Sequence, residues 1–274
     1  MEWSRVKSIM IGVFFIVNLV LFASYMGTTR TGMTINSETL ENTVIILRNN
    51  NVSIDPELIP RKMQDIRVFD TLNRFEYAAA AVSSFWDKAQ SLGLDYFNPE
   101  ATVTDGASFE YKPENPPTIK HFNERTAQAY AKGIVNKLEL GGGMSVESDV
   151  SFEDGGYVVA FYQVYEDSRV LDTRLVFEIK GDAVTRIYGK NWLCEEVTGG
   201  GLSPVRPVTE ILVNFAVAQN NEGKGPLTIS DVRLGYFIGD RNGKKSTITV
   251  VPVWRITVSS GEEFYYDARN GDLL

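Results

Sequence analysis

Residues 170–180 read VLDTRLVFEIK, and this stretch decides the fold class. Apolar and polar side chains alternate along it, which predicts a β-strand with one face in a core and the other in water. A sheet with one wet face is typical of antiparallel pairing. The buried face is expected to carry Leu171, Thr173, Leu175, Phe177 and Ile179.

Further strands and a helix flank this stretch. The largely apolar segment 157–165 precedes it, after the turn Glu166-Asp167-Ser168, and another strand is expected at 183–188. Short polar turns of this kind join neighbouring antiparallel strands. Upstream, apolar residues at helical spacing predict a helix from after Asn123 to about Leu140. We therefore expect residues 119–198 to form a helix packed on an antiparallel sheet.

The same order returns toward the C-terminus. Gly199-Gly200-Gly201 is expected to be a break, after which Ser203-Pro204 starts a helix that Gly223 ends. Residues 199–274 are therefore predicted to form a second helix-plus-sheet unit, a structural copy of the first with little sequence identity. Its strands are expected at 227–238, 246–258 and 263–268.

Residues 30–118 are expected to form a first unit of helices and extended segments. A helix capped by Asn36 or Ser37 is predicted to end at Asn49-Asn50-Asn51, and a second helix is expected at about 76–91. With the two downstream units, the fold class is α+β: repeated units of a helix packed on an antiparallel β-sheet.

The N-terminus carries a separate signal. The run Ile9–Met26 reads IMIGVFFIVNLVLFASYM, and no charged residue occurs from Ser8 to Thr29. As a helix it is about 27 Å long, close to the thickness of a hydrocarbon core. A cleaved signal peptide would have a shorter apolar region followed by a small-x-small site. We therefore predict a transmembrane helix at 8–29.

The charges beside this helix predict its orientation. Arg5 and Lys7 precede it, with Trp3 as an interfacial anchor, whereas Arg30 follows it. The positive-inside rule then places residues 1–7 in the cytoplasm and the rest of the chain outside. The expected location is the cell membrane, with a single span and an extracytoplasmic C-terminal part.

Composition excludes several function classes. The formal net charge is −8, which argues against a nucleic-acid binder. His121 and Cys194 are the single histidine and cysteine of the chain, so no intrachain disulfide and no Cys/His zinc cluster can form. Neither residue lies in a recognisable catalytic motif. We expect no enzymatic activity, no catalytic residue, no cofactor and no metal.

Polar and small residues of the apolar helix are the candidate contact residues. Asn18 lies near the middle of the helix and could bond to a partner helix, although a lone asparagine is also tolerated there at modest cost. Ser8 and Gly12 lie one turn apart and would permit close approach of a second helix. With the flanking residues, the candidate anchor and partner-contact set is Trp3, Arg5, Lys7, Ser8, Gly12 and Asn18.

Both ends of the chain resemble the YycI family. The opening MEWSRVK runs into an apolar helix that contains Asn18-Leu19, and the chain closes with Pro252-Val-Trp-Arg-Ile256 and Tyr265-Tyr-Asp-Ala-Arg-Asn-Gly271. The closing pattern is also similar to PepSY-like modules, in which a helix precedes an antiparallel sheet that ends in an aspartate-to-glycine turn. Length and single-anchor layout match along the whole chain.

The resemblance implies regulation without catalysis. With the similar YycH proteins, YycI proteins act as membrane-anchored accessory proteins of the WalK (YycG) sensor histidine kinase, which controls cell-wall metabolism in Gram-positive bacteria. Contact between these proteins and the kinase is attributed partly to transmembrane helices. The resemblance leaves open whether this chain forms a homodimer or a heterodimer. The resemblance to PepSY modules alone implies an alternative: an extracytoplasmic ligand-binding or protease-inhibitory module. Its groove would be lined by Tyr157, Tyr162, Tyr188, Tyr236, Trp254 and Tyr265, although core packing is the commoner role of such aromatics.

Overall fold

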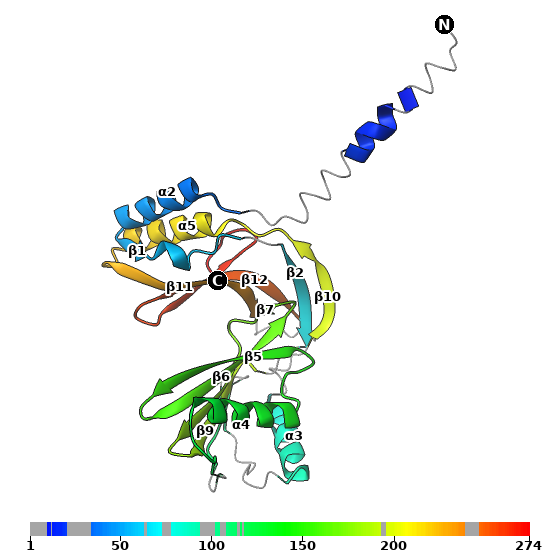
Figure 1. Cartoon of the computed structure of the whole chain (residues 1–274), viewed down its shortest axis with the longest axis vertical. Helices are drawn as coiled ribbons and strands as arrows, with labels where there is room; N and C mark the ends of the chain where they lie inside the picture. The colour runs from blue at the N-terminus through cyan, green and yellow to red at the C-terminus, as the bar shows by residue number, and fades with distance from the viewer. Residues whose placement is uncertain are drawn as a thin grey trace.

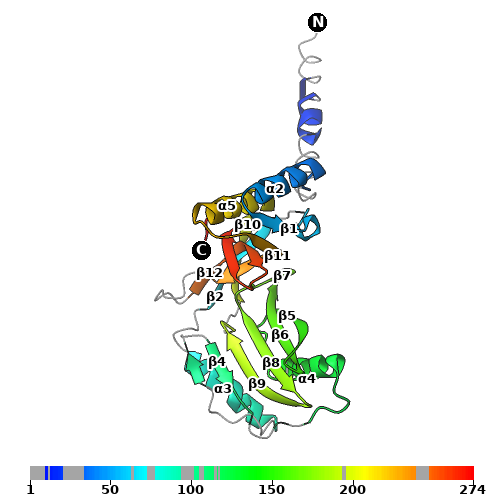
Figure 2. The same ribbon diagram turned by 90° about the vertical axis from the view of Figure 1, so that its left-hand side faces the viewer.

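The fold is α+β, as the sequence predicts. A computed structural model describes residues 10–11, 13–20, 34–62, 65–72, 78–93, 102–104, 108–113, 116, 118–192, 196–238 and 247–274. Within these ranges the strands form two sheets, each with helices on one face (Figure 1). The turned view in Figure 2 shows the two sheets stacked end to end, with α2 and α5 at one end and α3 and α4 at the other.

The first sheet contains six strands. A short parallel pairing joins β1 to β11, and the pairs β11–β12, β12–β2, β2–β10 and β12–β13 are antiparallel. The strands are β1 (Val52–Ile54), β2 (Ile66–Leu72), β10 (Glu196–Ser203), β11 (Leu227–Ile238), β12 (Thr247–Val258) and β13 (Glu263–Asp267). The long hairpin of β11 and β12 forms its centre.

Helices α2 (Ser37–Asn49) and α5 (Val208–Asn221) pack together over this sheet, and a short 3-10 helix, η1 (Pro56–Leu58), follows β1. Asn36 caps α2 by accepting a hydrogen bond from the backbone N–H of Thr39, so the expected cap is confirmed. The core between helices and sheet includes Leu47, Phe215 and Trp254, all of which are fully buried. The helical spacing of apolar residues in this segment of the sequence predicts one buried face, and the structure confirms it: the buried residues of α5 include Val208, Ile211, Leu212, Phe215 and Ala216.

The second sheet contains seven strands, and all its pairings are antiparallel. Two helices cover it, α3 (Ala78–Ser91) and α4 (Glu124–Lys137). Its strands are β3 (Thr102–Thr104), β4 (Ser108–Tyr111), β5 (Ser145–Glu153), β6 (Gly156–Tyr165), β7 (Ser168–Arg169), β8 (Arg174–Lys180) and β9 (Ala183–Lys190). Phe161, Phe177 and Trp192 lie in its core, beneath α4.

An aromatic cluster joins the two sheets. Phe69 of β2 stacks on Tyr165 of β6 with ring centroids 4.0 Å apart, and the edge of Tyr236 from β11 closes the group. The backbone N–H of Leu171 donates to the carbonyl of Tyr236 at 2.8 Å. The connection between β7 and β8 therefore continues the edge of the first sheet.

This junction corrects the prediction for residues 170–173. The strand β8 begins at Arg174, four residues later than the alternation suggests. Asp172 was expected to face water, yet it is buried, and its carboxylate accepts a hydrogen bond from the backbone N–H of Ile238 at 3.1 Å. Residues 170–173 are buried because they contact the first sheet, and this burial extends the strand-like pattern beyond the start of β8.

The expected break at residues 199–201 is also wrong. These glycines lie inside β10, so the boundary between 198 and 199 falls within a strand. A Cβ at Gly200 would approach the carbonyl oxygen of Val68 to 2.5 Å, which explains why glycine occupies this position in the sheet. The following helix starts at Val208, after an N-cap at Pro207, and not at Ser203-Pro204.

Residues 30–118 do not form a unit of their own among the described ranges. Their strands β1 and β2 belong to the first sheet, whereas β3 and β4 extend the second. Long-range strand pairing therefore distributes this segment over both sheets, which local sequence patterns cannot indicate.

Much of the predicted transmembrane segment, 8–29, lies outside the described residues. Residues 10–11 and 13–20 are helical and exposed, and they stand apart from both sheets in Figures 1 and 2. Within the described residues, the structure contains no helix with the length and apolar character needed to cross a bilayer.

Candidate interaction site

A charged network occupies the face of the second sheet that α4 does not cover. Along β5, Val146 and Val150 pack toward the core, so Glu147 and Asp149 point to the opposite face. Arg169 of β7 reaches across that face and donates two hydrogen bonds to Asp149, at 2.6 and 2.8 Å, and one to Glu147, at 2.7 Å. Its guanidinium lies 4.7 Å from the ring centre of Tyr162.

These contacts favour the charged forms of Asp149 and Arg169. The hydrogen bonds from Arg169 lower the pKa of the Asp149 carboxyl, although partial burial opposes the shift. The same bonds raise the pKa of Arg169, whose side chain is only 18% exposed. A bidentate guanidinium–carboxylate pair over an aromatic ring is a rigid arrangement, so these groups are held in one geometry.

A second network lies on the uncovered face of the first sheet. Asp231 of β11 accepts hydrogen bonds from Arg233 at 3.2 Å and from Arg255 of β12 at 2.9 Å. Arg255 also donates to Glu263 of β13 at 3.2 Å, and Glu263 accepts from the hydroxyl of Tyr265 at 2.6 Å. Burial would lower the pKa of Arg255, but these carboxylates outweigh burial and raise it.

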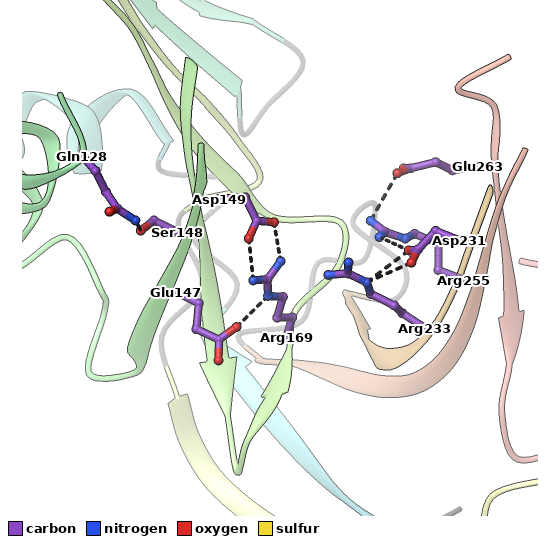
Figure 3. A network of polar contacts seen from close by, with 9 residues as sticks. All are labelled: Gln128, Glu147, Ser148, Asp149, Arg169, Asp231, Arg233, Arg255 and Glu263. Atoms are coloured by element: carbon purple, nitrogen blue, oxygen red, sulfur yellow. Dashed lines mark hydrogen bonds and ion pairs between the residues drawn. The ribbon is translucent and has the colours of Figure 1, made fainter. Parts of the chain in front are cut away.

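The two networks face each other at the junction of the sheets (Figure 3). The positive charges of Arg233 and Arg255 contribute to the lowered pKa of Asp149, so the networks are coupled electrostatically across the junction. Fixed carboxylate and guanidinium groups of both signs are suited to recognising a charged partner surface.

Most of the predicted contact residues lie outside the described ranges: Trp3, Arg5, Lys7, Ser8 and Gly12. Asn18 is described, and its side-chain amide donates to the carbonyl of Phe14 at 2.8 Å, one turn earlier in the same helix. This bond satisfies one of the two donors of the amide within the helix itself.

The six aromatic residues considered for a groove are divided between core and surface. Tyr236 and Trp254 are completely buried, and the Trp254 indole N–H donates to the carbonyl of Arg206 at 3.0 Å. Tyr157 packs against Phe122 and Phe152. The remaining three, Tyr162, Tyr188 and Tyr265, are half-buried beside arginine or glutamate side chains.

The single histidine is exposed in a turn and has a φ of 54°. The carbonyl of His121 accepts hydrogen bonds from Asn123 and Thr126 at the start of α4, so the residue takes part in a helix cap. Cys194 lies outside the described residues. In the described ranges no three His, Cys, Asp or Glu side chains are grouped so that they could hold a metal ion.

Two of the cavities lined by described residues are small. One is lined by apolar side chains of the second core, such as Phe85 and Leu175, and holds about 10 Å³, which is barely one water molecule. The other, next to Glu153 and Lys180, holds about 60 Å³. Both are far smaller than the roughly 300–1,000 Å³ of a typical ligand pocket.

Sequence reasoning missed Arg169 and Asp149 as site residues. Glu147 and Asp149 alternate with Val146, Ser148 and Val150, which is a signal for a half-buried strand. That signal would have placed both acids on one face, but nothing local pairs them with Arg169.

Comparisons with known proteins give information about the fold and about nothing else. No family model matches the chain. No curated protein matches it either. A solved structure of an uncharacterized protein from Eubacterium rectale is similar, with a TM-score of 0.55 and 12% sequence identity over 85% of this chain and 98% of that chain. At this identity the likeness shows that the two chains share a fold, and it carries no function.

Proposed function

We propose that this chain is a membrane-anchored, non-enzymatic accessory regulator of a sensor histidine kinase of the WalK (YycG) type. In this proposal residues 8–29 cross the membrane and the two sheets lie outside it. The chain acts with a YycH-like partner, through contacts of the transmembrane helix and of the extracytoplasmic part.

The proposal is supported by the position of the C-terminal segments that resemble the YycI family, because they lie at the charged network of the first sheet. The closing segments that resemble YycI overlap β12 and β13, and they supply Arg255 and Tyr265 to the network on the first sheet. The residues that carry the family likeness thus contribute directly to the charged surface at the junction.

A contact mechanism has a physical basis. A membrane anchor confines both partners to one surface and raises their effective concentration, so weak contacts suffice. The regulator shifts the kinase between two states only if it binds one of them more tightly. Rigid charged networks supply such discrimination, because a displaced partner charge loses its counterpart.

Co-purification from intact membranes tests the proposal. The full chain is expected to retain the kinase, and replacing residues 8–26 by an unrelated apolar helix is expected to weaken association and alter signalling. A polyleucine-type helix of equal length keeps the anchor and so serves as the matched replacement. Unchanged association and signalling would contradict the transmembrane part of the proposal.

A second candidate is a ligand-binding or protease-inhibitory module of PepSY type. The half-buried tyrosines Tyr162 and Tyr188, each beneath an arginine guanidinium, favour it. Protease inhibition by the purified chain, or a small molecule retained through purification, would support this candidate over the first.

A further inference from the structure

The strand β5 forms an edge of the second sheet. It is nine residues long, and among the described residues it pairs with β6 and with no strand on its other side. Its register with β6 runs without a bulge from Ser145 to Glu153. Edge strands are usually blunted by bulges, prolines, short length or charged side chains, and of these features β5 has the charges alone, as acids on one face.

The hairpin turn determines which backbone groups of β5 point outward. Asp154 and Gly155, with φ of 49° and 78°, form a two-residue turn of the primed type. Glu153 and Gly156 are therefore a hydrogen-bonded pair, and such pairs alternate along the ladder. The four residues Val146, Ser148, Val150 and Phe152 then direct their N–H and C=O groups away from β6.

The register on the far side of β6 agrees with this assignment. The carbonyl of Gln163, which lies opposite Val146, accepts from the N–H of Val170 at 2.8 Å. It therefore points away from β5, as a residue of a non-hydrogen-bonded pair must.

The side chains along this edge indicate what kind of strand could join it. Phe152 is 65% exposed at the end of the strand, where an added strand would cover it. On the opposite face lie Glu147, Asp149 and Glu153, and the single charge of Arg169 leaves this row of acids net negative. Opposite charges on neighbouring strands stabilise a sheet, and like charges destabilise it.

This charge pattern disfavours a second copy of the chain as the occupant. Antiparallel pairing must match outward-pointing residues with one another, so the odd-numbered residues of the two copies also meet. In the fully overlapping register, Asp149 of one copy would then lie directly opposite Asp149 of the other, with the acid Glu147 of each copy diagonal to it.

We propose that β5 accepts, as an added strand, an extended segment of a partner protein in which basic residues alternate with apolar ones. The basic side chains lie beside the acids, and the apolar ones cover Phe152 on the opposite face. Main-chain hydrogen bonds supply affinity and alternate side chains supply selectivity. The inference rests on the proposed function only in taking the partner to be a protein.

Hydrogen exchange of the full chain in detergent micelles tests the proposal with a nonapeptide of alternating lysine and valine. The amides of Val146, Ser148, Val150 and Phe152 are expected to become protected, and a peptide of alternating glutamate and valine is expected to protect none of them. Absence of protection, or equal protection by both peptides, would overturn the proposal. Protection that grows with chain concentration without peptide would overturn it in favour of a second copy.

Two pairs of variants sharpen the test. Val150→Pro removes an outward donor but no hydrogen bond to β6, and it is expected to weaken peptide binding by about tenfold or more, whereas Val150→Ala keeps the donor and the affinity. Glu153→Lys is expected to weaken binding several-fold, unlike Glu41→Lys on the distant helix α2. Equal effects within either pair would contradict strand addition at this edge. No kinase is present, so failure here leaves the co-purification result untouched.

Discussion

Arg169 connects three neighbouring side chains on one face of the second sheet. Its guanidinium binds Asp149 and Glu147 while it lies against the ring of Tyr162. Such pairs contribute little when fully exposed, but Arg169 is largely shielded from water. The contribution of Asp149 to stability is accordingly small and positive, and it depends on pH.

Asp149→Asn is predicted to destabilise the protein by about 0.5–1 kcal/mol at pH 7, a value reduced for the half-exposed carboxylate. Because the folded protein lowers the pKa of Asp149 below 3.8, its contribution is complete above that pH. It is lost as the pH falls through the lowered pKa. Thermal unfolding of wild type and Asp149→Asn is measured at pH 7 and near pH 3, and the difference in melting temperature is expected to be smaller at the lower pH.

The control for this variant is Asp182→Asn, in the exposed turn between β8 and β9. It should leave the melting temperature unchanged at both pH values. A difference between wild type and Asp149→Asn that grows on acidification would show that the assignment of the ion pair is wrong.

At the scale of elements, β10 is shaped by backbone packing against β2. Two register shifts interrupt the pairing between β10 and β2, and Gly200 lies at the second of them. The carbonyl of Val68 leaves no room for a side chain there. Gly201, by contrast, has nothing within 4 Å of the position that a Cβ would take.

Gly200→Ala is therefore predicted to destabilise the protein by about 1–3 kcal/mol, because a backbone shift must relieve the overlap. Gly201→Ala removes a neighbouring glycine without that overlap and is predicted to change stability by less than about 0.5 kcal/mol. Chemical denaturation of both variants measures the difference. Equal losses would mean that β10 does not pack on β2 in this register.

Elements with strong local signals were predictable from the sequence. The cap at Asn36, the apolar stripe of α5 and the strand at 227–238 all match the structure. The glycine run at 199–201 was misread, because a close approach to a neighbouring strand and a chain break leave the same local pattern.

At the scale of the whole molecule, the two sheets are joined through side chains from distant parts of the sequence. Phe69 and Tyr165 stack although nearly a hundred residues separate them, and Arg67 forms an ion pair with Glu166 at 3.1 Å beside them. Residues 170–172 add hydrogen bonds to β11. These contacts couple the stability of one sheet to that of the other.

Phe69→Ala is predicted to cost about 3–5 kcal/mol and to uncouple the sheets, so that thermal unfolding splits into two transitions. Phe215→Ala removes an equally buried ring of α5, away from the junction, and should lower stability without splitting the transition. Calorimetry of both variants shows whether each unfolds in one transition or in two. A single transition in both variants would show that the sheets are coupled elsewhere.

The sequence could not reveal this junction or the candidate site. Leu171 and Asp172 fit a half-buried strand in their local pattern, and only contact with Tyr236 and Ile238 explains their burial. Likewise, the pairing of Arg169 with Asp149 depends on how β5, β6 and β7 align. Helix periodicity and turn residues are local properties, whereas these contacts arise from the tertiary fold.

The most direct test of the account is site-specific photo-crosslinking from position 18 of the full chain in intact membranes, followed by identification of the attached protein. We predict that the crosslinked partners are a sensor histidine kinase and a YycH-like protein. Attachment to lipid alone, or recovery of the chain outside the membrane with its first helix removed, would contradict it.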